Sequence, residues 1–153
     1  MIDRSDFDRL LSANRYLVVA TADEACAPWA TPVFFAPLDQ DRLCWVSSPD
    51  SRHSRNVAIR PSVAVTVFDS TVPVGGAEAA YADADAAPAP TELMAAALDA
   101  LNRRLPDGRG LTVEDVRPLG PMLVYVAEVR RRYVLARGGD PDHGNVLDTT
   151  VEV

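Results

Sequence analysis

The chain has 153 residues, of which 48% are hydrophobic and 24% charged; these proportions are typical of a folded globular protein and argue against a chain that is disordered as a whole. Its formal net charge of -7 argues against nucleic acid or an anionic membrane as a partner, because both bind through clustered basic surface. The length is that of one domain, so we expect residues 1–153 to form a single unit, with its core at about 14–136 and a polar tail at 138–153.

The first predicted element is a helix at residues 3–13, where apolar residues recur at helical spacing and Asp3 or Ser5 caps the N-terminus. Short runs rich in β-branched and aromatic residues then predict three strands. These runs are residues 16–21, 29–36 and 42–47. Pro32 interrupts the second run, and a proline inside a strand indicates an edge, a bulge or an opening in the ladder.

A short helix follows, because Ser51 is a good N-cap and Pro61 ends the helical stretch. Later residues predict a strand at 62–68, a weak strand at 78–82, a helix at 91–105, a helical turn at 112–116 and a long strand at 122–135. The Ala-, Pro- and Asp-rich residues 83–90 are interpreted as a linker. In the last strand, the odd-numbered residues from Leu123 to Leu135 share one face, and only Arg131 breaks that pattern.

The fold class predicted from these elements is mainly β. About six strands joined by short loops are mostly antiparallel neighbours, and several of them are apolar on both faces. A β-barrel with flanking helices satisfies both conditions, because its closed sheet has a filled interior and helices cover the outside.

The segment from Cys44 to Asp69 carries the strongest functional signal. Unpaired N–H groups and the positive end of the helix dipole meet there, at the start of the short helix. The same turn supplies hydroxyl and basic side chains, from Ser47, Ser48, Ser51, Arg52, His53 and Arg55. This combination predicts a phosphate-binding site, although an ordinary solvated turn with helix caps remains the alternative.

Other chemistries receive no support from local motifs. The two cysteines, Cys26 and Cys44, have no ligand cluster around them, so we expect no metal site. Reduced, partly buried thiols are expected, and a disulfide between the two is the alternative that the sequence leaves open. No catalytic triad, phosphate-binding loop or dinucleotide fingerprint can be assembled. The acidic, amphipathic N-terminus is unlike a secretory leader, and no apolar run is long enough for a membrane span, so we expect a cytoplasmic protein.

The order of these elements resembles the pyridoxamine 5'-phosphate oxidase-like, FMN-binding split-barrel family. The matching features are a strand ending in Ala20-Thr21, a strand with Pro32-Val33-x-Phe35, an Asp-rich hairpin, the segment Ser51-Arg52-x-x-Arg55-Asn56 and the run from Pro61 to Phe68. The resemblance covers residues 16–82 well and 119–143 loosely. It implies a six-stranded antiparallel split barrel of the FMN-binding type, forming a homodimer with the cofactor in the cleft between subunits.

Carried over by position, the resemblance implies one set of cofactor-binding residues, with the phosphate held by the serines, Arg52 and His53. The set comprises Thr31, Pro32, Val33, Val46, Ser47, Ser51, Arg52 and His53. Residues 30–35 are expected to border the flavin ring, partly through backbone groups. The chain departs from the family at His53, where many members have lysine, and at Ala30 and Phe35, where the oxidase has basic residues. These departures argue against oxidation of pyridoxamine phosphate itself.

The resulting hypothesis is a flavin-dependent oxidoreductase that acts on a small-molecule substrate, with FMN or a deazaflavin as cofactor. No catalytic residue is assigned, because the flavin performs the redox chemistry. Two alternatives remain open: a non-enzymatic protein that binds flavin, deazaflavin or haem, and a cofactor-free dimeric scaffold. Four aromatic residues, Trp29, Phe34, Phe35 and Trp45, are candidates for stacking on a flavin, although core or interface positions are the simpler interpretation.

Overall fold

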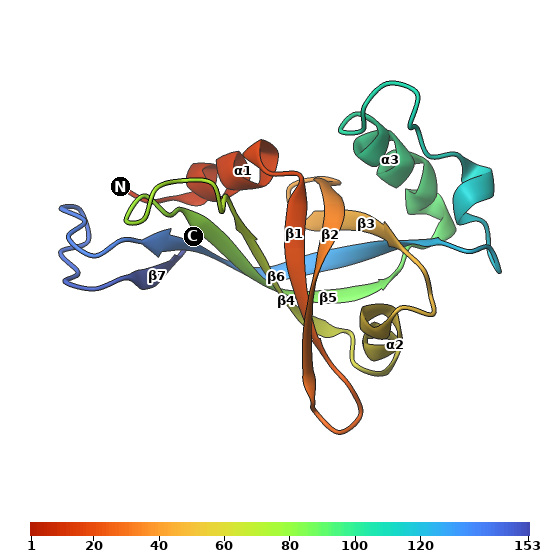
Figure 1. Ribbon diagram of the computed structural model, residues 1–153, viewed down its shortest axis with the longest axis horizontal. Helices are drawn as coiled ribbons and strands as arrows, with labels where there is room; N and C mark the ends of the chain where they lie inside the picture. The colour runs from red at the N-terminus through yellow and green to blue at the C-terminus, as the bar shows by residue number, and fades with distance from the viewer.

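A computed structural model describes residues 1–153 and contains one antiparallel sheet of seven strands, six of which close into a barrel (Figure 1). The strand order is β3-β2-β1-β4-β5-β6-β7, and pairing of β3 with β6 closes the barrel. The strands are β1 (Tyr16–Ala22), β2 (Pro28–Pro37), β3 (Arg42–Ser47), β4 (Ser62–Phe68), β5 (Ala79–Pro88), β6 (Leu123–Ala136) and β7 (Thr149–Glu152). The predicted fold class, a mainly β antiparallel barrel with flanking helices, is confirmed.

The helices begin and end close to the predicted positions. They are α1 (Arg4–Ala13), α2 (Arg52–Ile59), α3 (Thr91–Asn102) and the 3-10 turn η1 (Val113–Val116). Asp3 caps α1 in a capping box with Asp6, and Ser51 caps α2. The third helix stops at Asn102, three residues earlier than predicted, and the arginines that follow it lie in a loop.

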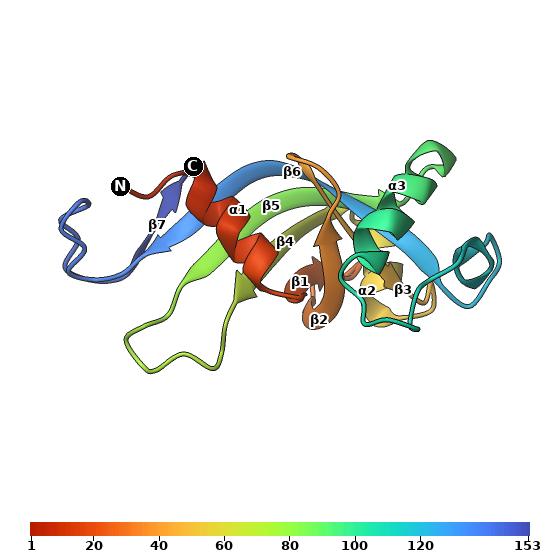
Figure 2. The same cartoon turned by 90° about the horizontal axis from the view of Figure 1, so that it is seen from above.

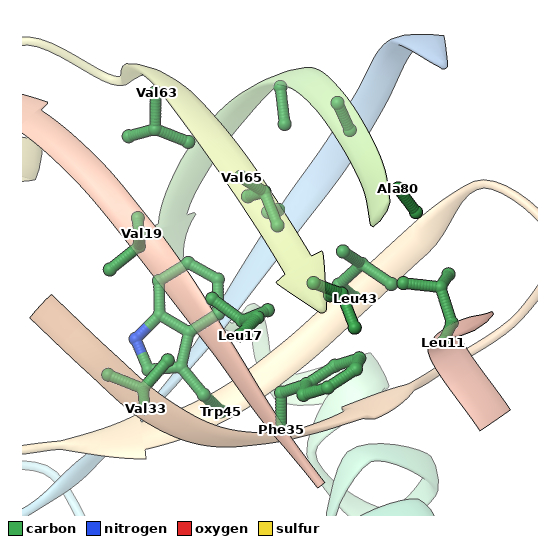
Figure 3. Packing of buried hydrophobic residues seen from close by; sticks show 14 of the residues in the cluster. Leu11, Leu17, Val19, Val33, Phe35, Leu43, Trp45, Val63, Val65 and Ala80 are labelled. Atoms are coloured by element: carbon green, nitrogen blue, oxygen red, sulfur yellow. The ribbon is translucent and has the colours of Figure 1, made fainter. Parts of the chain in front are cut away.

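The barrel interior is filled by large apolar side chains from β1, β2 and β3 and by small ones from β5. Trp45 and Phe35 are fully buried there, and Trp45 stacks on Tyr125 with ring centroids 5.9 Å apart. Figure 3 shows Trp45 beside Val19 and Val33, and Phe35 beside Leu43. The simpler interpretation therefore holds for these two aromatics: they are core residues and cannot stack on a ligand.

The three helices cover different parts of the barrel (Figure 2). Phe7, Leu10 and Leu11 of α1 join the interior cluster and close one end of the barrel. A second apolar cluster lies outside the barrel, where Leu98 and Leu101 of α3 pack on β3 and β6. None of the helices is both long and apolar enough to cross a bilayer.

Pro32 occupies the kind of position that the sequence predicted. Residues 28–34 of β2 pair with β1, whereas the ladder between β2 and β3 contains only the pairs from Phe35 to Pro37. Pro32 therefore lies where one side of β2 has no neighbouring strand, and its missing N–H disrupts no ladder on that side. This open edge also exposes Trp29 and Ala30.

The interpretation of residues 83–90 as a linker is wrong for residues 83–88. They continue β5 and pair with β4 through Asp85 and with β6 through Pro88. Alternate side chains, Ala80, Ala82, Ala84 and Ala86, all point into the core. Alanine is a poor strand former and resembles linker composition, but here its small side chain fits against the large rings of the facing strands.

The predicted single face of β6 is also wrong beyond Val129. The ladder with β5 shifts register there, since Ala84 pairs with Val129 and Asp83 pairs with Arg131, which leaves Arg130 as an extra residue in a bulge. The bulge reverses the facing of later residues, so Val134 is buried in the core and Tyr133 points outward. The run Arg130-Arg131-Arg132 lies in the middle of the strand, where each arginine forms an ion pair.

The apolar outer faces predicted to be covered are only partly covered within this chain. Phe68 of β4 is 47% exposed, and Tyr16 at the start of β1 is 62% exposed. The residues after Gly138 include β7, which pairs with β6 from Tyr133 to Ala136. The C-terminal segment thus returns to the sheet and places its end beside the N-terminal helix (Figure 2).

We predict that Ala84→Leu destabilises the protein by about 1–3 kcal/mol, because Ala84 is fully buried and three more carbon atoms must be forced into a filled interior. The matched control is Ala87→Leu, three positions along the same strand, where the side chain is exposed and little change is expected. Urea denaturation of the two variants measures the difference. Equal stabilities would contradict an inward-facing Ala84 and the strand assignment of residues 83–88.

Candidate functional site

The candidate site begins where β3 ends and α2 starts. Three side chains meet there: the Nε2 atom of His53 lies 2.8 Å from the Oγ of Ser47 and 3.2 Å from the Oγ of Ser51. The Ser51 hydroxyl also contacts the Ser54 hydroxyl at 2.8 Å and accepts from the Ser54 N–H at 3.4 Å. The structure therefore brings together Ser47, Ser51 and His53, as the sequence predicted.

His53 is only 9% exposed, and this burial lowers the pKa of its imidazole below the ordinary value. The ring is therefore neutral near pH 7 and acts as a hydrogen-bonding group rather than as a cation. An anion placed beside it would oppose this effect, because a nearby negative charge favours the protonated ring. The Ser47–Ser51–His53 cluster is thus suited to respond to a bound phosphate by taking up a proton.

Arg52 presents its charge on the open side of the same helix start. Its side chain is exposed, forms no ion pair, and lies over the ring of Trp29 with its Cζ atom 4.5 Å from the centroid. The backbone N–H groups of Arg52 and His53 have no hydrogen-bond partner within the protein. Two free N–H groups, a guanidinium and nearby hydroxyls form a donor set that fits a phosphate monoester.

A buried hydrogen bond that the sequence reasoning missed connects α2 to the barrel. The side-chain amide of Asn56 donates to the Oγ1 of Thr21 in β1 at 3.0 Å, and both residues are buried. Arg55 donates to the main-chain oxygen of Asp50 and pairs with no acidic group. Apolar spacing gave no signal for the contact between Asn56 and Thr21, because the two residues are 35 positions apart and belong to different elements. This contact holds the helix start against β1 and β2.

The remaining predicted residues lie on two strands beside this helix. Thr31 and Pro32 are on the open part of β2, half-buried and exposed respectively, whereas the Val33 side chain is in the core and its main-chain groups face β1. Val46 directly precedes Ser47 in β3 and packs against the outer apolar cluster. These positions line one end of the barrel, as Figure 1 shows for β2, β3 and α2.

Neither cysteine belongs to the site. Cys44 is fully buried between β3 and α3, and burial raises the pKa of its thiol to about 12, so it is not a nucleophile. Cys26 lies in the turn between β1 and β2, where it is exposed rather than partly buried as predicted, with φ at 63°. Both thiols are free.

Comparison with known proteins gives a family match and a set of similar folds. A family model described as pyridoxamine 5'-phosphate oxidase matches residues 5–130. No curated protein sequence matches the chain significantly. The matched residues include every predicted cofactor-binding position and extend from α1 to the bulge in β6.

Three solved structures illustrate the range of proteins that share this fold. The haem storage protein HutZ from Vibrio cholerae is 17% identical, with a TM-score of 0.71 over 88% of this chain and 95% of its own. An FAD-binding protein from Mesorhizobium loti is 17% identical, with a TM-score of 0.65 over 86% and 92%. An F420 reductase is 22% identical, with a TM-score of 0.58 over 82% and 94%. At these identities the likeness is one of fold.

The lowered pKa of His53 leads to a prediction about stability and pH. In the unfolded chain the imidazole protonates near its ordinary pKa of 6.5, whereas in the folded protein it resists protonation. Stability is therefore fully present above pH 6.5 and falls as the pH drops below it, with an upper limit of about 1.4 kcal/mol per pH unit that partial solvation reduces. Urea denaturation at several pH values is expected to show this loss in the parent.

The matched control is His53→Gln, which keeps a hydrogen-bonding side chain but has no titrating ring. Its stability is expected to change less between pH 7.5 and pH 5.5 than that of the parent. Parallel pH profiles for the two proteins would contradict a buried, neutral His53.

Proposed function

The chain belongs to the pyridoxamine 5'-phosphate oxidase family, and on that premise we propose that it is a flavin-dependent oxidoreductase that binds FMN and acts on a small molecule. The observation that carries the proposal is the donor set at the start of α2. It combines the free N–H groups of Arg52 and His53, the exposed guanidinium of Arg52, and the hydroxyls of Ser47 and Ser51. A flavin mononucleotide ends in a phosphate that suits such a set.

In this proposal the cofactor supplies the redox chemistry, and the protein's residues bind and orient it. Arg52 is the charged phosphate partner, and its contact with the Trp29 ring holds the guanidinium beside the helix start. The open edge of β2 offers main-chain groups, namely the N–H and C=O of Ala30 and the C=O of Pro32, to the polar rim of a planar ring. The hydrogen bond between Asn56 and Thr21 holds α2 against β1, the strand that pairs with the open part of β2.

We also propose that the active form is a homodimer with the cofactor in the cleft between subunits. The support comes from the open β2 edge and from large apolar side chains that the single chain leaves exposed, namely Trp29 and Phe68. A second copy covering these residues would bury apolar surface and exclude water from the ring. Light scattering on the purified protein measures the mass directly.

The alternatives are a non-enzymatic protein that holds flavin, a deazaflavin or haem, and a scaffold without a cofactor. Haem is less well supported by the geometry, because the Nε2 of His53 would have to leave both Ser47 and Ser51 to ligate an iron. A deazaflavin is supported by the fold likeness to an F420 reductase. Position 30 is alanine and position 35 is a buried phenylalanine, and none of these alternatives requires a basic group at either position.

The absorbance spectrum of the purified protein, followed by titration with FMN, deazaflavin and haem, separates these functions. Flavin absorption together with oxidation of a reduced nicotinamide supports the enzyme. Flavin absorption without turnover under any donor supports the binding protein. A Soret band, or a colourless protein that takes up none of the three, contradicts the flavin proposal.

We predict that Arg52→Ala weakens FMN binding by about 1.5–3 kcal/mol, the usual contribution of a charge-assisted hydrogen bond. Arg60→Ala is the matched control, because Arg60 lies at the other end of the same helix and contacts only main-chain oxygens of Asp23 and Glu24. Fluorescence titration of FMN into the parent and the two variants measures the change. Equal dissociation constants for the parent and Arg52→Ala would remove Arg52 from the site.

A further inference from the structure

The arginines of this chain fall into two groups. Seven of the fifteen form ion pairs with carboxylates, mostly on the outer surface of the barrel. The other eight have no carboxylate within 4.0 Å. Four of these eight line a single pocket, and they are Arg15, Arg103, Arg104 and Arg109. In a chain with a net charge of -7, an unpaired cluster of this size is a local excess of positive charge.

The pocket lies between the loop that follows α3 and three strand segments, namely the start of β1, the second half of β2 and the end of β3. Its volume is about 750 Å³. In Figure 1 the C-terminal end of α3, where this loop begins, points toward the start of β1. Tyr16 and Phe34 form part of one wall, with their rings edge to face and centroids 6.2 Å apart. No carboxylate lines the pocket, and Asp107, the acidic residue of the same loop, forms no ion pair.

Two of the four arginines are held by the fold. Arg104 donates to the main-chain oxygens of Leu11 and Asn14, and its guanidinium lies over the buried ring of Phe35 at 4.8 Å. Arg15 donates to the main-chain oxygen of Arg104 at 2.5 Å, and its positive charge is near enough to repel that of Arg104. Burial and the charge of Arg15 together lower the pKa of Arg104, and the Nη1 of Arg104 is buried without a partner. The wall of the pocket thus carries positive charge that nothing in the chain neutralises.

The other two arginines are free to act as ligand-binding arms. Arg103 and Arg109 are exposed, and neither side chain donates a hydrogen bond to the protein. Both follow α3 closely in sequence. Arg104 lies between them, and its hydrogen bond to the main-chain oxygen of Leu11 fixes this loop to the C-terminal end of α1. Guanidinium groups pair with carboxylates and phosphates in a bidentate manner, and their faces stack on flat rings.

We propose that this pocket binds a small organic anion with a flat apolar body, its acidic group held by Arg103 and Arg109 and its body lying against Tyr16 and Phe34. Val46, which directly precedes Ser47 in β3, also lines the pocket. The pocket therefore adjoins the strand end that carries the candidate phosphate site. The identification of this anion as the substrate rests on the proposed function, whereas the binding site itself does not.

The test uses three probes that separate charge from shape: 1-naphthyl phosphate, neutral 1-naphthol and inorganic phosphate. Isothermal titration into the purified full-length chain, without added cofactor, is expected to show 1-naphthyl phosphate binding at least about tenfold more tightly than either of the others, and more weakly as salt is added. Arg103→Gln and Arg109→Gln are each expected to weaken its binding about tenfold. Neither substitution removes a hydrogen bond, so both variants are expected to keep the parent's circular dichroism spectrum.

Two controls locate the site and keep it separate from the proposed cofactor site. Arg137→Gln makes the same charge change at an arginine that has no carboxylate partner and lies outside the pocket, and it is expected to bind the probe like the parent. Arg52→Ala is expected to weaken FMN binding and to leave unchanged the part of 1-naphthyl phosphate binding that depends on Arg103 and Arg109. Failure of FMN to bind, with 1-naphthyl phosphate still bound through Arg103 and Arg109, would reject the flavin function and retain this site.

Three results would overturn the proposal. The first is no binding of 1-naphthyl phosphate by the parent at millimolar concentration. The second is equal affinity for 1-naphthol, which would make the pocket a purely apolar one. The third is unchanged affinity in both Arg103→Gln and Arg109→Gln, which would place the probe elsewhere.

Discussion

Pairing of β3 with β6 closes the sheet, and the place of the candidate site depends on that ladder. It runs in unbroken register from Arg42 opposite Glu128 to Ser47 opposite Leu123. β3 pairs with β6 along its whole length on one edge, whereas on its other edge only three of its residues pair with β2. The short ladder leaves the remainder of β2 with an open edge, and the chain leaves β3 at Ser47 and reaches Ser51, the cap of α2, four residues later. The open backbone edge and the helix start therefore both lie beside the end of β3.

The protein has a negative net charge, but its unpaired arginines are concentrated in two places. Several carboxylates near the barrel strands form ion pairs with arginines, as with Asp41 and Arg132 or Glu152 and Arg131. The arginines without carboxylates concentrate at the start of α2 and around the loop after α3. An acidic protein with two local positive sites repels polyanions at long range, yet attracts small anions to the places where arginines are unpaired. This arrangement suits small-molecule ligands.

Much of the fold was predictable from local patterns, and the failures have physical causes. The helix at Arg4–Ala13, the cap at Ser51 and the strand at Ser62–Phe68 follow from spacing, capping and β-branched residues, all of which act over a few positions. The second half of β5 was missed because alanine and aspartate are weak strand formers, and pairing on both sides outweighs that preference. The bulge at Arg130 was invisible because it is defined by register against β5.

The sequence by itself determined the barrel class, the family and the presence of a hydroxyl- and arginine-rich helix start, because each follows from patterns in short, continuous stretches of residues. Only the tertiary structure decided which groups meet. It joined Asn56 to Thr21, seated Arg52 on Trp29, and gathered Arg15 with the arginines after α3 into one pocket. These contacts join residues far apart in the chain, and they exist because closing the sheet brings distant strands and loops to the same end of the barrel.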